Sequence, residues 1–258
     1  MKNLRILFFI MALGSVAVFA YSLNHRYAGA ASKTSLPKSK NVISYDTAVV
    51  NRLHKVSNWL NVDRPECLIS GTIKIIQMAD SAESGQMKYL FSKNGSKSCY
   101  IYGEGELIVD GDLVFNIDHH LKRVLFTKKQ FGSEFGQQNR FLDTKALIDA
   151  YKKAHYKLKT YKSGSKQTIS LLNDEHLSCT EYSVTFDTTS LKPEKLFVRM
   201  PNLEFLNDKS KDNILVIYLN QLSNSSQIQR YNRSESIVTS QGNIRLEGLL
   251  KDYTLKQL

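Results

Sequence analysis

Short runs of alternating apolar and polar residues, separated by tight turns, dominate the chain from Ser70 to Lys129. Two junctions, Asn94-Gly95 and Asp110-Gly111, carry dipeptides typical of two-residue type I′ hairpin turns, which require positive φ at both central residues. Because hairpins need only local pairing, an antiparallel meander is the simplest arrangement. The predicted strands cover residues 71–78, 86–93, 97–102, 105–110, 113–118 and 121–128.

Apolar residues recur at helical spacing between Ser44 and Asn61. Ser44 is the predicted N-cap, and Asp46 lies in the first turn, where the helix dipole favours a carboxylate. The apolar stripe is expected to pack against the neighbouring sheet. It consists of Val49, Leu53, Val56 and Leu60.

The second half of the chain predicts a loop at 131–142, a helix at about 143–156 and a further set of strands. These elements give an α+β fold in which antiparallel strands predominate. The predicted division is one folded domain over residues 44–219 and a C-terminal extension over 220–258. The later strands are expected at 157–162, 167–173, 180–187, 195–200 and 213–219, with a weak strand at 243–247.

The N-terminus has the pattern of a secretory signal peptide. Lys2 and Arg5 precede an uncharged apolar stretch, and Val18-Phe19-Ala20 offers small residues at the expected cleavage site. Residues 1–20 are therefore interpreted as a signal peptide, with an uncleaved N-terminal membrane anchor as the alternative. Residues 21–43 are rich in Ala, Ser and Lys and predict a flexible linker.

The chain of 258 residues carries 35 basic and 24 acidic side chains, a net charge of +11. This charge permits attraction to nucleic acid, anionic lipid or an acidic partner, but the basic residues form no dense block. A solvated basic surface is the simpler interpretation. Export to a compartment that normally lacks nucleic acid, and the missing aromatic motif of sheet-based RNA binders, both argue against nucleic-acid binding.

Three cysteines, Cys67, Cys99 and Cys179, cannot all pair within one exported molecule. One disulfide with a free thiol and three buried thiols are both open.

The chain contains no nucleophile elbow, zinc-protease motif, phosphate loop or dinucleotide fingerprint. Asp118-His119-His120 is the densest group of candidate metal ligands, and a polar turn is the favoured interpretation. The sequence therefore predicts neither an enzyme nor a cofactor.

The order of elements resembles the bacterial outer-membrane lipoprotein-carrier family, the LolA-like half-open β-barrels. The resemblance rests on Ser70-Gly71-Thr72, on the run from Leu107 to Asp118 with its Asp-Gly turn and aromatic-bearing strand, and on the hairpin that ends at 194–198. It implies a strongly curved antiparallel sheet whose concave face is covered by helices, in a periplasmic protein that shields lipid. Where the family has an Arg-Pro pair, this chain has Lys93-Asn94.

We therefore predict a periplasmic carrier that binds a lipid or acyl chain, or an acylated protein such as a lipoprotein, between the sheet and the first helix. Inner- or outer-membrane components are further candidate partners. The alternative is an exported or anchored interaction module whose core is filled and holds no ligand. The predicted lining consists of Val49, Leu53, Val56, Leu60, Ile73, Ile75, Tyr89, Phe91, Leu107, Val109, Phe115 and Ile117.

Overall fold

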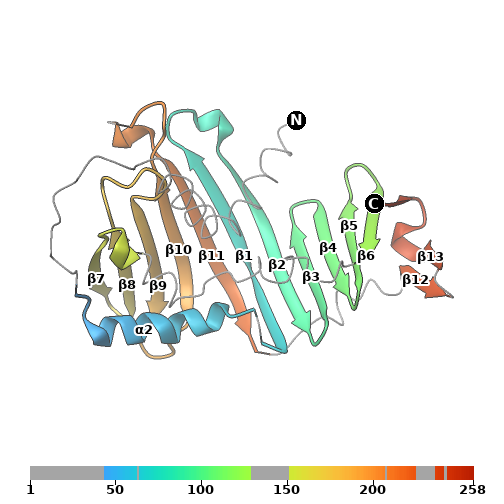
Figure 1. The fold of residues 1–258 in the computed structure, drawn as a ribbon, viewed down its shortest axis with the longest axis horizontal. Helices are drawn as coiled ribbons and strands as arrows, with labels where there is room; N and C mark the ends of the chain where they lie inside the picture. Colours follow the sequence, from blue (N-terminus) through green and yellow to red (C-terminus); the bar gives the residue numbers. More distant parts are fainter. Residues whose placement is uncertain (1–43, 63, 129–150, 207, 225–235, 241–242) are drawn as a thin grey trace, which may run out of the picture. The chain divides into compact units, whose positions relative to one another are not determined.

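The computed structural model describes residues 44–62, 64–128, 151–206, 208–224, 236–240 and 243–258 (Figure 1). The predicted signal segment, the linker, the loop at 131–142 and most of the second helix lie outside these ranges, although residues 151–153 are helical. The chain forms two compact units. Of the described residues, the first unit contains those within 44–62, 77–81 and 151–214, and the second contains those within 64–76, 82–128 and 215–258. No helix in the described ranges is long and apolar enough to cross a membrane.

Twelve described strands share one sheet, in the order β14-β6-β5-β4-β3-β2-β1-β11-β10-β9-β8-β7. The sheet is open, because its outer strands β14 and β7 each have a neighbour on one side only. The predicted class, an α+β fold built on an open antiparallel sheet, is confirmed. The bounds are β1 (Glu66–Gln77), β2 (Gly85–Asn94), β3 (Lys97–Tyr102), β4 (Gly105–Asp110), β5 (Leu113–Asp118), β6 (Arg123–Lys128), β7 (Lys157–Ser163), β8 (Lys166–Leu172), β9 (Glu181–Asp187), β10 (Pro193–Met200), β11 (Asn213–Ser223) and β14 (Thr254–Gln257).

The hairpin turns are of a different type from the one predicted. In the β2–β3 hairpin Asn94 pairs with Lys97, and in the β4–β5 hairpin Asp110 pairs with Leu113. The glycine is therefore the first of the two turn residues rather than the second. Only this residue has positive φ, +59° at Gly95 and +61° at Gly111. Positive φ at the first centre alone is the pattern of a type II′ turn.

The first helix, α2 (Thr47–Ser57), begins later than the sequence suggested. Its N-cap is Asp46 rather than Ser44, because Asp46 Oδ1 accepts hydrogen bonds from the backbone amides of Ala48 at 2.7 Å and Val49 at 3.4 Å. The helix tightens into a 3₁₀ turn, η1 (Asn58–Leu60). The predicted stripe is otherwise correct, since Leu53, Val56 and Leu60 are buried and Val49 is half-buried.

Helix α2 lies over one face of the first unit's strands β7 to β10 (Figure 1). Arg52 on the helix donates a hydrogen bond to Gln167 Oε1 on β8 at 2.6 Å. The register places Gln167 on the same face as a set of apolar side chains that are buried. The helix thus buries this face. The set comprises Ile169, Leu171, Tyr182, Val184, Phe186 and Leu196.

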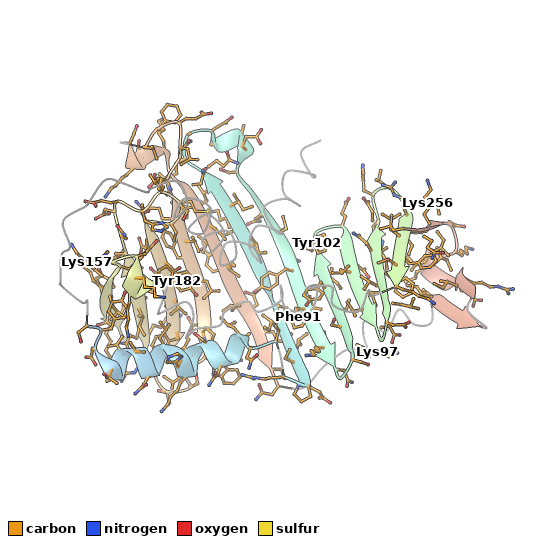
Figure 2. The ribbon with its side chains drawn as sticks, viewed as in Figure 1. Phe91, Lys97, Tyr102, Lys157, Tyr182 and Lys256 are labelled. Atoms are coloured by element: carbon orange, nitrogen blue, oxygen red, sulfur yellow. The ribbon has the colours of Figure 1, made fainter. Side chains whose placement is uncertain are left out.

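A cluster of tyrosines ties the start of α2 to the first unit's sheet. Tyr45 Oη donates to the carbonyl oxygen of Tyr156 at 2.8 Å, and the Tyr156 hydroxyl donates to the carbonyl oxygen of Cys179. The ring of Tyr151 lies 4.4 Å from that of Tyr156 and stacks at 6.1 Å on Tyr182 of β9, which Figure 2 labels. Burial raises the pKa of Tyr45 to about 12 and that of the Cys179 thiol to about 12.

This cluster predicts a loss of stability at alkaline pH. The folded-state pKa values of Tyr45 and Cys179 exceed their ordinary values of 10.0 and 9.0, so the unfolded chain ionises first. The contribution of these two groups to the free energy of unfolding is expected to be constant between about pH 7 and 8 and to be lost steadily between about pH 9 and 12. Denaturant titrations at fixed pH values would measure this. A free energy that stays constant across pH 9–11 would contradict it.

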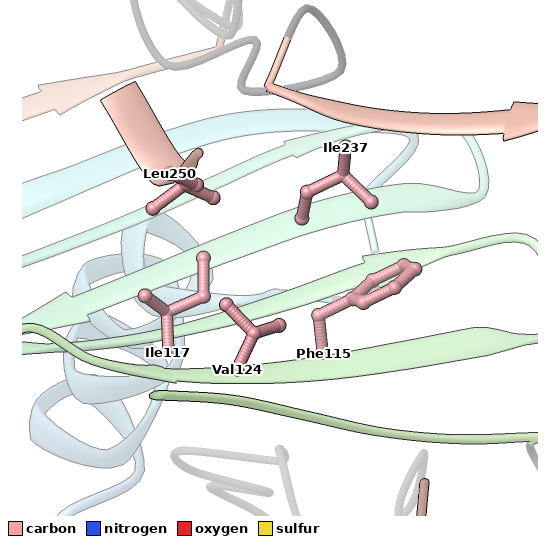
Figure 3. Close-up of a cluster of buried hydrophobic side chains, with 5 residues drawn as sticks. All are labelled: Phe115, Ile117, Val124, Ile237 and Leu250. Atoms are coloured by element: carbon pink, nitrogen blue, oxygen red, sulfur yellow. The ribbon is translucent and has the colours of Figure 1, made fainter. Parts of the chain in front are cut away.

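In the second unit, the C-terminal segment is part of the fold. β12 (Ile237–Ser240) pairs with β13 (Asn243–Leu246), and β14 pairs with β6 in parallel. Side chains of this segment complete a buried hydrophobic cluster with those of β5 and β6 (Figure 3). The extension expected after residue 219 therefore supplies both a strand and a core to the second unit. The cluster consists of Phe115, Ile117, Val124, Ile237 and Leu250.

A polar contact also holds this segment. His119 Nε2 lies 2.8 Å from Glu106 Oε1, and His119 Nδ1 lies 2.8 Å from the hydroxyl of Tyr253. The side chain of Glu106 is almost fully buried, and the imidazole of His119 supplies a hydrogen-bond partner for it. The predicted polar turn at Asp118-His119-His120 is thus also a connection between β4 and the chain just before β14. Within the described residues, no group of three His, Cys, Asp or Glu side chains is placed to hold a metal.

All three cysteines are buried and reduced. Cys67 pairs across the strands with Lys93, whereas Cys99 pairs with Ser92, so the two side chains point to opposite faces of the sheet. Of the two alternatives that the sequence left open, the structure has three buried thiols.

Leu249 and Leu250 provide a matched test of the C-terminal cluster. Leu250 is fully buried, whereas Leu249 is 78% exposed. Leu250→Ala is expected to lower the free energy of unfolding by about 2–5 kcal/mol, because it removes buried methyl groups and leaves a cavity. Leu249→Ala should change it by less than about 0.5 kcal/mol. Equal values for the two variants in chemical denaturation would show that the segment does not contribute to the core.

Candidate ligand-binding face

The strand register of the second unit defines two faces for strands β1 to β5. Residues that pair directly across antiparallel strands share a face, and the pairs Ile69–Phe91, Phe91–Tyr100 and Tyr100–Leu107 carry one face across four strands. We call it the tyrosine face. Its apolar and aromatic members are Ile69, Ile73, Ile75, Met87, Tyr89, Phe91, Tyr100, Tyr102, Leu107, Val109 and Val114.

Six of the predicted lining residues lie together on the tyrosine face: Ile73, Ile75, Tyr89, Phe91, Leu107 and Val109. Phe115 and Ile117 do not, and their assignment to the same lining is wrong. They pair with Ile108 and Glu106 on the opposite face. There, Phe115 and Ile117 belong to the hydrophobic cluster. The helix residues Val49, Leu53, Val56 and Leu60 belong to the first unit.

The misplacement has a simple geometric cause. A two-residue turn closes between residues i and i+3, so an odd-numbered residue on one strand faces an even-numbered residue on the next. Leu107 therefore pairs with Asn116, not with Phe115 or Ile117. The same rule puts Tyr100 and Tyr102 on the tyrosine face. Sequence reasoning missed these two tyrosines, although the turns at 95–96 and 103–104 contained the signal.

Two tyrosine rings of this face lie over glycines on the adjacent strand. Tyr89 pairs with Gly71, and Tyr102 pairs with Gly105. A Cβ atom at Gly105 would lie 2.5 Å from Tyr102 Cε2, and one at Gly71 would lie 3.1 Å from Tyr89 Cε1. The missing side chains let the rings lie against the backbone. At these two places, the aromatic rings therefore cover the strand backbone on the tyrosine face.

Aromatic contacts continue along the face between the two Tyr–Gly pairs. The rings of Phe91 and Tyr100 lie 4.5 Å apart with a tilt of 33°, and Figure 2 shows Phe91 and Tyr102 on neighbouring strands. Phe91 is buried, whereas Tyr89, Tyr100 and Tyr102 are half-buried. Burial raises the pKa of Tyr89 and of Tyr100 above the ordinary value. Their hydroxyls are therefore neutral hydrogen-bonding groups at physiological pH.

One hydroxyl of this face has no protein partner. The oxygen of Tyr89 is shielded from solvent, and no described residue forms a hydrogen bond with it. Leaving a buried hydroxyl unbonded costs about 1–3 kcal/mol. Arg123 Nε, at the start of β6, is also buried without a partner among the described residues. It shares the tyrosine face, because Arg123 pairs with Asp118, and Asp118 pairs with Gly105. The face thus combines apolar area with unused hydrogen-bonding capacity.

Among known proteins, only solved structures are similar to this chain. No protein-family model and no curated protein matches the sequence. An uncharacterised conserved protein from Thermus thermophilus matches over 82% of this chain and 100% of its own, at 7% identity and a TM-score of 0.40. A LolA-superfamily protein from Nitrosomonas europaea matches over 72% and 97%, at 7% identity and a TM-score of 0.29. The chain is distantly similar to LolA-superfamily structures.

A third similar structure comes from a complex. MucB from Pseudomonas aeruginosa, solved with MucA, matches over 79% of this chain and 64% of its own, at 9% identity and a TM-score of 0.35.

The close approach of Gly71 to the backbone of β11 gives a test of stability. A Cβ atom at Gly71 would lie 1.8 Å from the backbone oxygen of Tyr218 on β11, whereas one at Gly85 would meet nothing within 4 Å. Gly71→Ala should therefore force the two strands apart and lower the free energy of unfolding by about 1–3 kcal/mol. Gly85→Ala is the matched control, with an expected change of less than about 1 kcal/mol. Thermal or denaturant unfolding would measure both, and a neutral Gly71→Ala would contradict the close approach.

Proposed function

We propose that this protein is an exported binding or carrier protein that holds a lipid or acyl chain against the tyrosine face. The observation that carries the proposal is the composition of this face: contiguous aliphatic and aromatic side chains, several of them half-buried, around a buried hydroxyl that has no protein partner. Ligand sites are typically apolar surfaces with a few placed polar groups.

The proposed lining rests on the sheet alone. Leu53, Val56 and Leu60 of the first unit are already buried by protein atoms, so their apolar area is not available to a ligand. Of the six predicted residues on the tyrosine face, Ile73, Ile75 and Phe91 are likewise buried. The proposed contact surface therefore consists of the half-buried residues Tyr89, Leu107 and Val109, together with Tyr100 and Tyr102.

The energetics favour an acyl chain of medium length or longer. Burying one CH₂ group contributes about 0.8 kcal/mol, so a chain of about twelve carbons contributes about 10 kcal/mol. Association costs about 4–15 kcal/mol in lost translational, rotational and side-chain freedom. A medium-length chain therefore offsets an association cost in the lower part of this range without any ion pair, provided that most of its methylenes are covered, and a longer chain offsets more.

The buried hydroxyl of Tyr89 favours a ligand with a polar group beside the apolar part. An ester or amide carbonyl that displaces the side chains covering this hydroxyl would accept a hydrogen bond from it and remove the cost of leaving it unbonded. An acyl ester or an acylated protein fits this requirement better than a plain hydrocarbon.

Localisation is proposed from the N-terminal sequence. A cleavable signal at 1–20, or an uncleaved anchor in the same place, would deliver the folded part to the periplasm, and residues 21–43 would tether it. Mass analysis of the N-terminus of the exported chain would distinguish the cleaved form from the anchored form.

The binding proposal predicts a difference between the two faces of the sheet. Leu107 lies on the tyrosine face and Ile101 on the opposite face, and both are half-buried. Leu107→Ser is expected to weaken the binding of a fluorescent fatty acid about tenfold, because it removes an apolar contact with the chain. Ile101→Ser is the matched control, expected to change the affinity less than twofold. Circular dichroism would establish that both variants fold.

Native mass spectrometry of the protein purified from a membrane-containing source supplies the second measurement. Lipid adducts that disappear in Leu107→Ser would support the proposal. Absence of adducts together with absence of fatty-acid uptake would favour the alternative, an interaction module whose apolar face only fills its own core.

A further inference from the structure

One end of the first unit exposes several large apolar side chains. They lie on three loops: the one after β1, the one between β8 and β9, and the one between β10 and β11. Isolated exposed apolar residues are common, but a group of this size marks an interaction surface. The side chains and their exposed fractions are Met78 44%, Leu177 65%, Leu203 70%, Phe205 45% and Leu206 49%. We call this group the apolar end.

Hydrogen bonds connect the three loops. Lys209 Nζ, in the β10–β11 loop, lies 2.8 Å from Asp174 Oδ1 in the β8–β9 loop. The backbone amide of Met78 donates to the carbonyl oxygen of Asp212 at 3.3 Å. These contacts place all three loops, each with exposed apolar side chains, at the same end of the unit.

The backbone of the β10–β11 loop is hydrogen-bonded within the loop. The amides of Glu204 and Phe205 donate to Asn202, at 3.0 Å to its side chain and 2.9 Å to its carbonyl, and the amide of Asp208 donates to the carbonyl of Phe205 at 2.8 Å. An apolar environment penalises unsatisfied backbone groups by several kcal/mol each. This loop avoids much of that penalty, so its leucines and Phe205 are suited to leave water.

The first described residues are connected to the β8–β9 loop of the apolar end. Tyr45, the second described residue, bonds to Tyr156, and the ring of Tyr156 lies 5.3 Å from that of His176 in the β8–β9 loop. A flexible coil of 23 residues, the length of the predicted linker 21–43, would span about 25 Å. A chain held at a membrane by its N-terminus would therefore keep the apolar end within reach of that membrane.

We propose that the apolar end inserts into the interfacial layer of a phospholipid bilayer. Insertion is driven by the burial of Leu177, Leu203, Phe205, Leu206 and Met78, in the same way as the apolar faces of interfacial helices. This docking does not depend on whether the tyrosine face binds an acyl chain.

The charges of the apolar end distinguish its insertion into the bilayer from electrostatic adsorption to the bilayer surface. Carboxylates outnumber ammonium groups on the three loops, and hydrogen bonds from the Ser210 side chain and backbone keep the pKa of Asp208 low, so it is ionised at neutral pH. Adsorption of a chain with a net charge of +11 would instead require anionic lipid and would be lost in salt. The apolar end should insert into zwitterionic vesicles.

Tryptophan placed at the apolar end tests the proposal directly. Phe205→Trp in a Trp59→Phe background, using the full chain, would be mixed with phosphatidylcholine vesicles that carry brominated acyl chains. We expect a blue-shifted emission and at least twofold quenching at position 205. Leu249→Trp in the same background is the matched control, because Leu249 is 78% exposed but lies in the second unit, and it should be quenched by less than a fifth.

A second measurement separates insertion from charge. The quenching at position 205 should be unchanged in 0.5 M salt and should not increase when phosphatidylglycerol is added. The double variant Leu203→Ser/Leu206→Ser should reduce it at least fivefold. Emission from position 205 that remains unquenched, quenching that is equal at positions 205 and 249, or quenching that needs anionic lipid would each overturn the proposal.

Discussion

The hydrogen-bond register of the second unit's strands is the constraint on which the candidate site depends. The hairpins β2–β3, β3–β4 and β4–β5 all close through two-residue turns, and each closure fixes which side chains share a face. This pairing gathers Tyr89, Phe91, Tyr100, Tyr102 and Leu107 on one surface. The same pairing sends Phe115 and Ile117 to the other surface. A slip of one residue in the pairing of a strand would exchange the two sets of side chains on that strand.

The two faces of this sheet meet different requirements. The face that carries Phe115, Ile117 and Val124 is closed by the C-terminal segment, whose Ile237 and Leu250 complete a core. The tyrosine face instead retains half-buried aromatic side chains and the unbonded hydroxyl of Tyr89. A protein that needed this face only as core would gain stability by replacing that hydroxyl with hydrogen. The contrast between a completed face and an unsatisfied one is the reason for assigning ligand binding to the second.

In the first unit, polar and aromatic contacts hold helix α2 on the strands. Helix α2 has a narrow apolar stripe, and the hydrogen bonds from Arg52 to Gln167 and from Tyr45 to the carbonyl of Tyr156 fix its position on the strands. The loops at the apolar end are held by Lys209 and by the backbone of Asp212, which leaves their leucines exposed. The first unit therefore has apolar side chains that are buried under the helix and others that are exposed on the loops of the apolar end.

Local patterns in the sequence determined most of the strands, the helical stripe and the open antiparallel class, because alternation, helical spacing and turn residues act over a few neighbours. They also placed six of the candidate lining residues on one face. Only the tertiary structure decided that Asp46 caps the helix, that the C-terminal segment joins β6 through β14, and that His119 connects Glu106 to Tyr253. These features depend on contacts between residues far apart in the chain. No local period encodes such contacts, so their partners emerge only when the strands have been paired.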